Sequence, residues 1–269
     1  MDLPNPTWFI GCGNMAGAMI EGWRGAGVGL SGATVIRPSG LPVQGIRTLT
    51  APDQAGSPPR LVILGFKPQK LDEVAPGLTP YLSSKTIVVS MLAGTEIASL
   101  RERFPTVAAV IRILPNLPVS VRRGVTPLYG EDVPAEAREL VEPLFATLGF
   151  AMWTQREDQL GTIGAVAGSG PAYVARFIEA LAKAGVQRGL SSELANIIAV
   201  ETVFGTAWMA SASGENMGEI ARRVASPNGT TEAGLKVLDS DGALEALISR
   251  TIDAASQRGA ELAAEARRS

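Results

Sequence analysis

The sequence predicts an α/β fold in its first half and an all-helical second half. Up to about residue 155, short apolar runs rich in Val, Ile and Leu alternate with amphipathic segments. The runs lack a two-residue alternation, which is typical of parallel strands buried on both faces, so a doubly wound sheet is expected. The length suits one large or two modest domains, at about 100–200 residues each, and the end of the strand pattern near Arg156 predicts two, at 1–156 and 157–269.

The expected strands and helices follow one another regularly in the first half. Strands are predicted at Trp8–Ile10, Ala33–Ile36, Leu61–Leu64, Thr86–Val89 and Val107–Ile111, with helices at Asn14–Gly25 and Gln69–Leu82. Prolines and glycines recur between Arg37 and Arg60. A proline inside a helix costs about 3 kcal/mol, so this segment is predicted to be a loop with one short strand near residues 46–48.

The second half is predicted to contain only helices, at 158–166, 171–188, 191–212, 214–224, 231–239 and 242–267. Ser191 can cap the third of them. The apolar stretch Leu194–Ala212 contains Asn196 and Glu201, so it is a poor candidate for a membrane span, which needs about 20 mainly apolar residues. We expect this helix to be buried in a domain core or a subunit interface.

Composition excludes several kinds of site. The chain has no histidine and one cysteine, Cys12, so it cannot form a Ser-His-Asp triad, a thiolate zinc cluster or an internal disulfide, and no metal site is expected. The formal net charge of −2 argues against nucleic-acid binding. The first residues do not resemble a signal peptide, and we expect a cytoplasmic protein.

A glycine-rich segment connects the first expected strand to the first expected helix. It reads G-x-G-x-x-A from Gly11 to Ala16. The first glycine permits a tight turn, Gly13 lets a pyrophosphate approach the backbone, and a small third residue allows the helix to pack on the strand. The helix N-terminus then offers free N–H groups to phosphate. This combination predicts a Rossmann-type dinucleotide-binding domain.

The end of the second expected strand indicates which dinucleotide binds. An NAD site usually has an acidic residue there, which bonds the ribose 2′-hydroxyl. This chain has Arg37, Pro38 and Ser39 instead. Arg37 and Ser39 can receive a 2′-phosphate, so NADP is expected in preference to NAD; the alternative is a solvent-exposed arginine beside a turn serine.

Four further motifs carry a resemblance to a known family. They are Gly65-Phe66-Lys67-Pro68-Gln69, Arg112-Ile113-Leu114-Pro115-Asn116-Leu117-Pro118, Gly168-Ser169-Gly170-Pro171-Ala172-Tyr173 and Ser226-Pro227-Asn228-Gly229-Thr230-Thr231. Together with the glycine loop, and in this order, they resemble the pyrroline-5-carboxylate reductases over nearly the whole chain. That family reduces the cyclic imine of L-pyrroline-5-carboxylate to L-proline with NADPH, or sometimes NADH, in proline biosynthesis. The resemblance implies that the helical domain forms a homodimer, which is often assembled into rings.

The resemblance also implies site residues. Those expected along the cofactor are Ile10, Gly11, Gly13, Asn14, Met15, Arg37, Pro38, Ser39, Phe66, Lys67, Pro68, Met91, Leu92 and Ala93. Those expected at the substrate are Asn116, Glu157, Ser226, Gly229, Thr230 and Thr231. Thr230 and Thr231 are the candidate catalytic residues, because a hydroxyl can hold or relay the proton of the ring nitrogen, and amides at a helix start can bind the substrate carboxylate.

Each of these residues also has a purely structural interpretation. Thr230 and Thr231 can cap the helix that follows them, Lys67 can be a solvated lysine, and Glu157 can be an exposed acid in the first turn of a helix.

The chain departs from the family pattern at several positions. Asn228 replaces a glycine, but asparagine tolerates a positive φ, so the turn can survive. Gly164 and Ala167 replace hydroxyl residues, Leu114 replaces a methionine, and Asn216 with Met217 replaces a His-Pro pair. The expected loop after Arg37 also replaces a second crossover helix.

Two alternatives remain open from the sequence. One is an NADP-binding regulator or sensor on the same scaffold, because a fold alone does not prove an activity. The other is an oxidoreductase like the β-hydroxyacid dehydrogenases, which use a lysine in the long helix after the domain junction. Here the only lysine of that helix, Lys183, comes three turns in, which disfavours this alternative.

Overall fold

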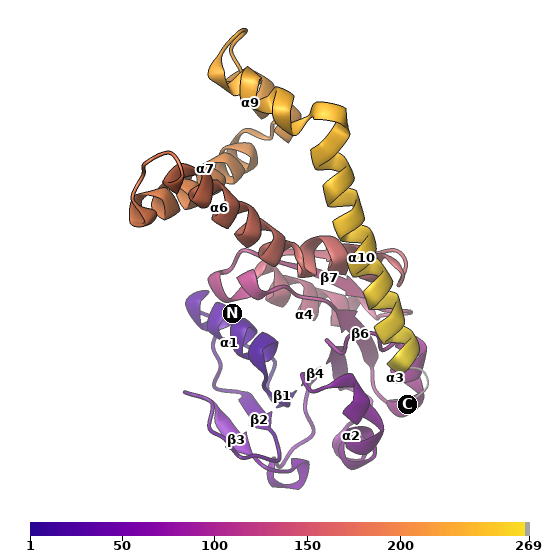
Figure 1. Cartoon of the computed structure of the whole chain (residues 1–269). Helices are drawn as coiled ribbons and strands as arrows, with labels where there is room; N and C mark the ends of the chain where they lie inside the picture. Colours follow the sequence, from indigo (N-terminus) through magenta and orange to yellow (C-terminus); the bar gives the residue numbers. More distant parts are fainter. Residues whose placement is uncertain (267–269) are drawn as a thin grey trace. The chain divides into compact units, whose positions relative to one another are not determined.

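The computed structural model describes residues 1–266, and it contains the predicted α/β region followed by helices alone (Figure 1). Two compact units can be distinguished. The first is Met1–Ser169 with the end of the last helix from Ala255 on, and the second is Gly170–Ala254. These limits differ from the expected boundary at 156/157, which stays a prediction.

Within the described residues, eight strands form one sheet in the order β3-β2-β1-β4-β5-β6-β7-β8. Neighbouring strands are parallel except for β6 and β7, which run antiparallel. The strands are β1 Thr7–Ile10, β2 Ala33–Ile36, β3 Arg47–Leu49, β4 Leu61–Leu64, β5 Ile87–Ser90, β6 Ala109–Ile113, β7 Gly124–Tyr129 and β8 Gly149–Trp153.

Helices cover both faces of this sheet, as the unbroken apolar strands predict. Alternate residues of β1 face opposite sides: Phe9 belongs to one buried cluster, and Trp8 and Ile10 belong to the other. The first cluster packs on α1 Asn14–Gly25 and α4 Ala135–Ala146, and the second packs on α2 Leu71–Leu78 and α3 Ile97–Arg103. Trp23 joins α1 to α4, because its indole N–H donates to the carbonyl of Leu144 at 3.0 Å.

Several expected elements differ from those observed. The helix expected at Gln69–Leu82 is shorter, and 3₁₀ turns at Pro68–Lys70 and Thr79–Tyr81 flank α2. The loop after Arg37 is confirmed: it holds the short strand β3 and a 3₁₀ turn at Pro52–Gln54. A 3₁₀ turn at Leu117–Val121 precedes β7.

The second half contains only helices among its described residues. They are α5 Gln159–Ile163, a π-helical turn at Gly164–Gly168, α6 Gly170–Val186, α7 Ser192–Ser213, α8 Met217–Val224, α9 Thr230–Leu238, a 3₁₀ turn at Ser240–Gly242 and α10 Ala243–Ala266. Ser191 caps α7 as predicted, accepting from the N–H of Leu194. Arg267, the expected end of the last helix, lies outside the described residues.

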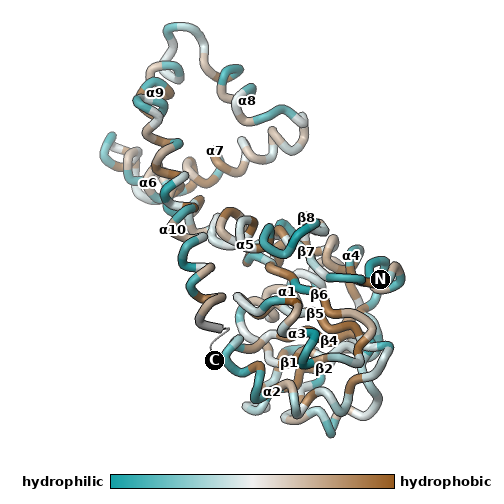
Figure 2. Tube along the Cα trace, turned by 90° about the vertical axis from the view of Figure 1, so that its right-hand side faces the viewer, coloured by the Kyte–Doolittle hydropathy of each residue, from teal (hydrophilic) through white to brown (hydrophobic). Residues whose placement is uncertain are grey.

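The helices of the second unit leave much apolar surface exposed within a single chain. Hydrophobic positions recur along α7 and α9 (Figure 2), and in α7 the side chains of Phe204 and Trp208 are 61% and 53% exposed. Their rings stack with centroids 6.4 Å apart. The expectation of a helix buried in a domain core is therefore wrong for a single chain, and the alternative expectation, a subunit interface, stays a prediction at this point.

Candidate active site

The turn between β1 and α1 has the geometry of a phosphate-binding loop. Gly11 has φ +79°, and a Cβ on it would lie 2.8 Å from the carbonyl oxygen of Gly65, so only glycine fits. Gly13 is the N-cap of α1, and no atom lies within 4 Å of the place its Cβ would take. No side chain caps the helix, so its first N–H groups face open space in which a phosphate fits.

The ends of β4 and β5 lie against this turn. An added Cβ on Gly11 would be 3.3 Å from the Cβ of Phe66, and one on Gly65 would be 3.0 Å from the Cε of Met91. The structure therefore brings the predicted residues of three strand ends together. Lys67 is exposed, whereas Leu92 is only 2% exposed and packs in the core. The side chain of Leu92 is thus not presented to a ligand.

Arg37 lies beside the glycine loop and is held by backbone carbonyls. Its Nη1 donates to the carbonyl of Cys12 at 3.3 Å, and its Nε donates to that of Leu41 at 2.8 Å. Its Nη2 also donates to the carbonyls of Leu41 and Pro42. These bonds place the guanidinium at the carboxyl ends of β1 and β2, and Ser39, two residues further along the chain, is exposed. The positive charge is therefore fixed where the sequence places the adenosine ribose.

Cys12 is a packing residue in this loop. Burial raises the pKa of its thiol, and the nearby positive charge of Arg37 offsets part of that rise. A thiol with a raised pKa stays protonated near neutral pH and is a poor nucleophile.

Glu157 connects three segments of the first unit. Its Oε1 accepts a hydrogen bond from the backbone N–H of Ile97 at 2.6 Å and an ion-pair bond from Nη1 of Arg112 at 2.5 Å. The sequence reasoning does not single out Arg112 as a functional residue. The available signal is that Arg112 is a charged residue within a strand that is otherwise buried.

Asn116 is 6% exposed, and its amide is bonded to backbone at both ends. Its Nδ2 donates to the carbonyl of Ala167 at 2.8 Å, and its Oδ1 accepts from the N–H of Val125 at 2.8 Å. Asn116 therefore ties the π-helical turn to the start of β7. Its expected contact with substrate stays a prediction.

The remaining predicted residues form a turn and a helix start in the second unit. The N–H of Gly229 donates to the carbonyl of Ser226 at 2.9 Å, and Asn228 has φ +59°. With Pro227 before it, this is a type II turn, and the prediction that asparagine supports the positive φ is confirmed.

Two expectations about this helix start need correction. The N–H of Gly229 is used within the turn, so it is not a free donor for a substrate carboxylate. Gly229 is the N-cap of α9, and no side chain caps that helix. The alternative role of Thr230 and Thr231 as capping residues is therefore wrong, and their hydroxyls make no hydrogen bond within residues 1–266.

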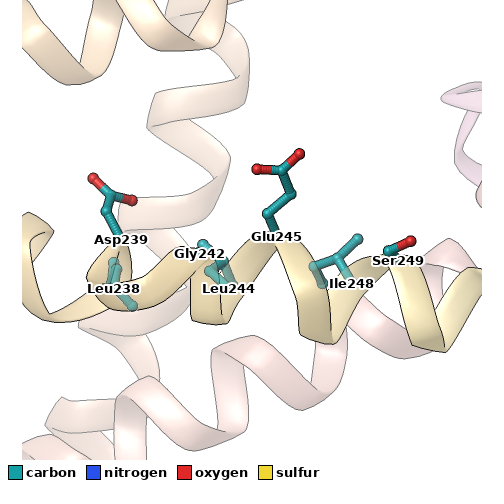
Figure 3. Close-up of a pocket in the computed structure, with 7 residues that line it drawn as sticks. All are labelled: Leu238, Asp239, Gly242, Leu244, Glu245, Ile248 and Ser249. Atoms are coloured by element: carbon teal, nitrogen blue, oxygen red, sulfur yellow. The ribbon is translucent and has the colours of Figure 1, made fainter.

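An open hollow of about 630 Å³ lies elsewhere in the second unit, along the end of α9 and the start of α10 (Figure 3). Leu238, Leu244 and Ile248 supply its apolar lining, and none of the predicted site residues lines it. The described part of the chain contains no group of three or more His, Cys, Asp or Glu side chains suited to a metal ion.

Comparison with known proteins gives matches over both halves. A family model for pyrroline-5-carboxylate reductase dimerisation matches residues 157–262, and one described as NADP oxidoreductase, coenzyme F420-dependent, matches residues 8–94. A pyrroline-5-carboxylate reductase of Pseudomonas aeruginosa is 37% identical over 95% of this chain and 96% of its own. Pyrroline-5-carboxylate reductase 2 of Bacillus subtilis is 32% identical, with 94% of each chain covered.

Solved structures agree with these matches. A pyrroline-5-carboxylate reductase from Coxiella burnetii superposes with a TM-score of 0.87 at 31% identity, covering 96% of this chain and 98% of its own. The Plasmodium falciparum pyrroline carboxylate reductase, solved with NADP bound, has the same fold, with a TM-score of 0.84 at 24% identity and the same coverage. The similarity to relatives over nearly the whole length, with both halves matched, shows that the chain belongs to the pyrroline-5-carboxylate reductase family.

Proposed function

We propose that this protein is a pyrroline-5-carboxylate reductase, which reduces the cyclic imine of L-pyrroline-5-carboxylate to L-proline with a nicotinamide cofactor. The observation that carries the proposal is the match to reductases of this name over 95% of the chain. The full-length match does not favour a regulator without turnover or a β-hydroxyacid dehydrogenase.

The residues of the first unit are suited to hold NAD(P)H. The amides at the start of α1 would bind the pyrophosphate, where the missing Cβ of Gly13 leaves room. Met91 and Ala93 would lie toward the nicotinamide. When bound, the cofactor supplies the hydride; the protein supplies orientation and electrostatics.

NADPH is the proposed preferred cofactor. The fixed guanidinium of Arg37 and the hydroxyl of Ser39 lie at the end of β2, where an acidic residue would select NAD. Either group can bond a 2′-phosphate, whereas Arg37 has no acceptor atom and Ser39 offers a single hydroxyl oxygen in place of the carboxylate that accepts from the ribose 2′-hydroxyl in NAD sites.

The residues of the second unit are suited to the substrate. The free first-turn N–H groups of Thr230 and Thr231 would bind the carboxylate, with a contribution from the helix dipole. The uncommitted hydroxyl of Thr231 would hold the proton on the ring nitrogen, which reaches the site as an iminium. No histidine is required.

We further propose a homodimer, formed through the helices of the second unit, as the functional form. By length and composition α7 is also able to cross a membrane. However, it lies within the region matched by the dimerisation model, so an interface between subunits is the proposed environment. A cytoplasmic location and a larger ring of dimers remain proposals.

The direct test follows the loss of NADPH absorbance with purified protein and L-pyrroline-5-carboxylate, beside NADH. We expect rapid oxidation that yields proline, with a higher kcat/KM for NADPH. Tight NADPH binding without oxidation would contradict the proposed reaction, and a preference for NADH would contradict the role of Arg37.

A further inference from the structure

The loop that joins β5 to α3 is short and constrained, and it lies near the glycine loop between β1 and α1. Its start is held by the hydroxyl of Ser90, which accepts from the N–H of Leu92 at 3.3 Å. Gly94 has φ +75°, and Thr95 is buried and donates its N–H to the carbonyl of Leu92. On the proposed function, Met91 and Ala93 of this loop lie toward the nicotinamide. A small shift of the loop would therefore displace the hydride donor.

The far end of this loop is fixed by a residue distant in sequence. α3 begins at Ile97 without a side-chain capping bond from its own N-cap residue. Glu157, sixty residues later, accepts from the N–H of Ile97 at 2.6 Å instead. A carboxylate at this position satisfies an otherwise unpaired N–H, and its negative charge interacts favourably with the positive end of the helix dipole.

Arg112 holds that carboxylate in place. It lies on β6, and its Nη1 donates to the same Oε1 of Glu157 at 2.5 Å. The side chains of Arg112 and Glu157 are only 13% and 25% exposed. Charge-assisted hydrogen bonds in such partly buried positions are stronger and less screened than those at the surface.

The neighbouring ion pair gives a contrast within the same segment. Arg156 and Asp158, on either side of Glu157, pair with each other at 3.0 Å, but their side chains are 69% and 68% exposed. Exposed ion pairs of this kind contribute little to the free energy of folding. In the segment after β8, the ion pair of Glu157 therefore also bonds the start of α3, whereas the Arg156–Asp158 pair is local and exposed.

We propose that Glu157 is a positioning residue for hydride transfer, which fixes the Ser90–Glu96 loop through the N–H of Ile97 and is itself held by Arg112. This proposal rests on the proposed function, and it replaces a direct contact of Glu157 with substrate.

Hydrogen–deuterium exchange tests whether Glu157 fixes this loop, without relying on activity. In Glu157→Ala we expect peptides covering residues 90–100 to exchange about tenfold faster or more, which is the factor expected for loss of a hydrogen bond to a charged group. Glu157→Gln keeps an oxygen acceptor but loses the charge, so its exchange should be intermediate. Asp158→Asn, which disrupts the exposed pair, should match the wild type in the exchange of residues 90–100. Unchanged exchange in Glu157→Ala would overturn the proposal.

Kinetics then test the consequence for catalysis. In Glu157→Ala we expect kcat to fall about tenfold or more, the Kd for NADPH to change less than about threefold, and deuterated NADPH to show a larger isotope effect on kcat. Glu157→Gln should recover part of the loss. Faster exchange with an unchanged kcat would overturn the proposal, and so would a higher KM for the imine at unchanged kcat, which indicates substrate contact. A wild type that reduces no imine would refute the proposed function. The exchange data would still decide whether Glu157 fixes the Ser90–Glu96 loop.

Discussion

At the scale of single residues, two glycines in one turn have different tasks. Gly11 is required by the fold, because its φ is +79° and the carbonyl of Gly65 occupies the space of a side chain. Gly13 has ordinary backbone geometry and open space around it. The same sequence motif therefore contains one glycine needed for folding and one that leaves room for the proposed cofactor.

Alanine substitutions should separate these tasks. In Gly11→Ala the positive φ alone costs about 1–2 kcal/mol, so Tm should fall by several degrees, at about 2–4 °C per kcal/mol. Gly13→Ala should leave Tm nearly unchanged and weaken NADPH binding about tenfold or more. Thermal unfolding and a fluorescence titration with NADPH measure both effects. Unimpaired binding by Gly13→Ala would show that no phosphate approaches this position.

Thr231 is the residue on which the proposed proton handling depends. Thr231→Ala should lower kcat about tenfold or more and leave the Kd for NADPH nearly unchanged, because the hydroxyl is assigned to the ring nitrogen. Thr231→Ser keeps the hydroxyl and should retain most of the activity. Because no side chain caps α9, the Tm of both variants should match that of the wild type. An unchanged kcat in Thr231→Ala would remove the residue from the mechanism.

Cys12 reports on the state of the glycine loop. It is the chain's single cysteine, and burial raises its pKa. The thiolate fraction at pH 7.5 is therefore lower than that of a free cysteine, so reaction with a disulfide reagent should be slower than that of free cysteine at pH 7.5 and should accelerate as the pH rises. NADPH should slow the reaction further. Rapid, pH-independent labelling would contradict the partly buried position.

At the scale of elements, sequence patterns predicted what buried, regular segments reveal. Strands such as Leu61–Leu64 consist only of large apolar residues, and α1 begins and ends where its glycines predict. β7 and β8 were not predicted. The sequence of β7 contains Pro127, and proline argues against a strand because it is disfavoured inside sheets. β8 is only partly buried, so its apolar pattern is weak. Tertiary pairing between these two strands, rather than local pattern, specifies them.

The site was predictable to a similar extent. Glycine positions and the Pro227–Asn228 turn follow from local conformational preferences, which the sequence displays directly. The bond from the Asn116 amide to Ala167 and the Glu157–Arg112 pair join segments 45 or more residues apart. Long-range hydrogen bonds of this kind leave no local pattern.

At the scale of the whole molecule, a single chain leaves the apolar side chains of α7 exposed. Phe204 is 61% exposed, and large exposed apolar patches mark interaction surfaces. We expect light scattering at micromolar concentration to give at least twice the 28.0 kDa mass of the chain. Phe204→Glu should shift the mass toward the monomer. Phe150→Glu, at a phenylalanine of the first unit that is 62% exposed, should not. A monomeric wild type would refute the interface.

The central claim is that this chain transfers hydride from a nicotinamide cofactor to the imine carbon of L-pyrroline-5-carboxylate. The most direct measurement uses NADPH deuterated at C4, on each face in turn, followed by mass spectrometry of the product. The C=N bond accepts one hydride at the imine carbon, which becomes C5 of proline, and the nitrogen takes one proton. One of the two labelled cofactors should therefore yield proline with a single non-exchangeable deuterium at C5. Proline without deuterium from both labelled cofactors, or no proline at all, would contradict the claim.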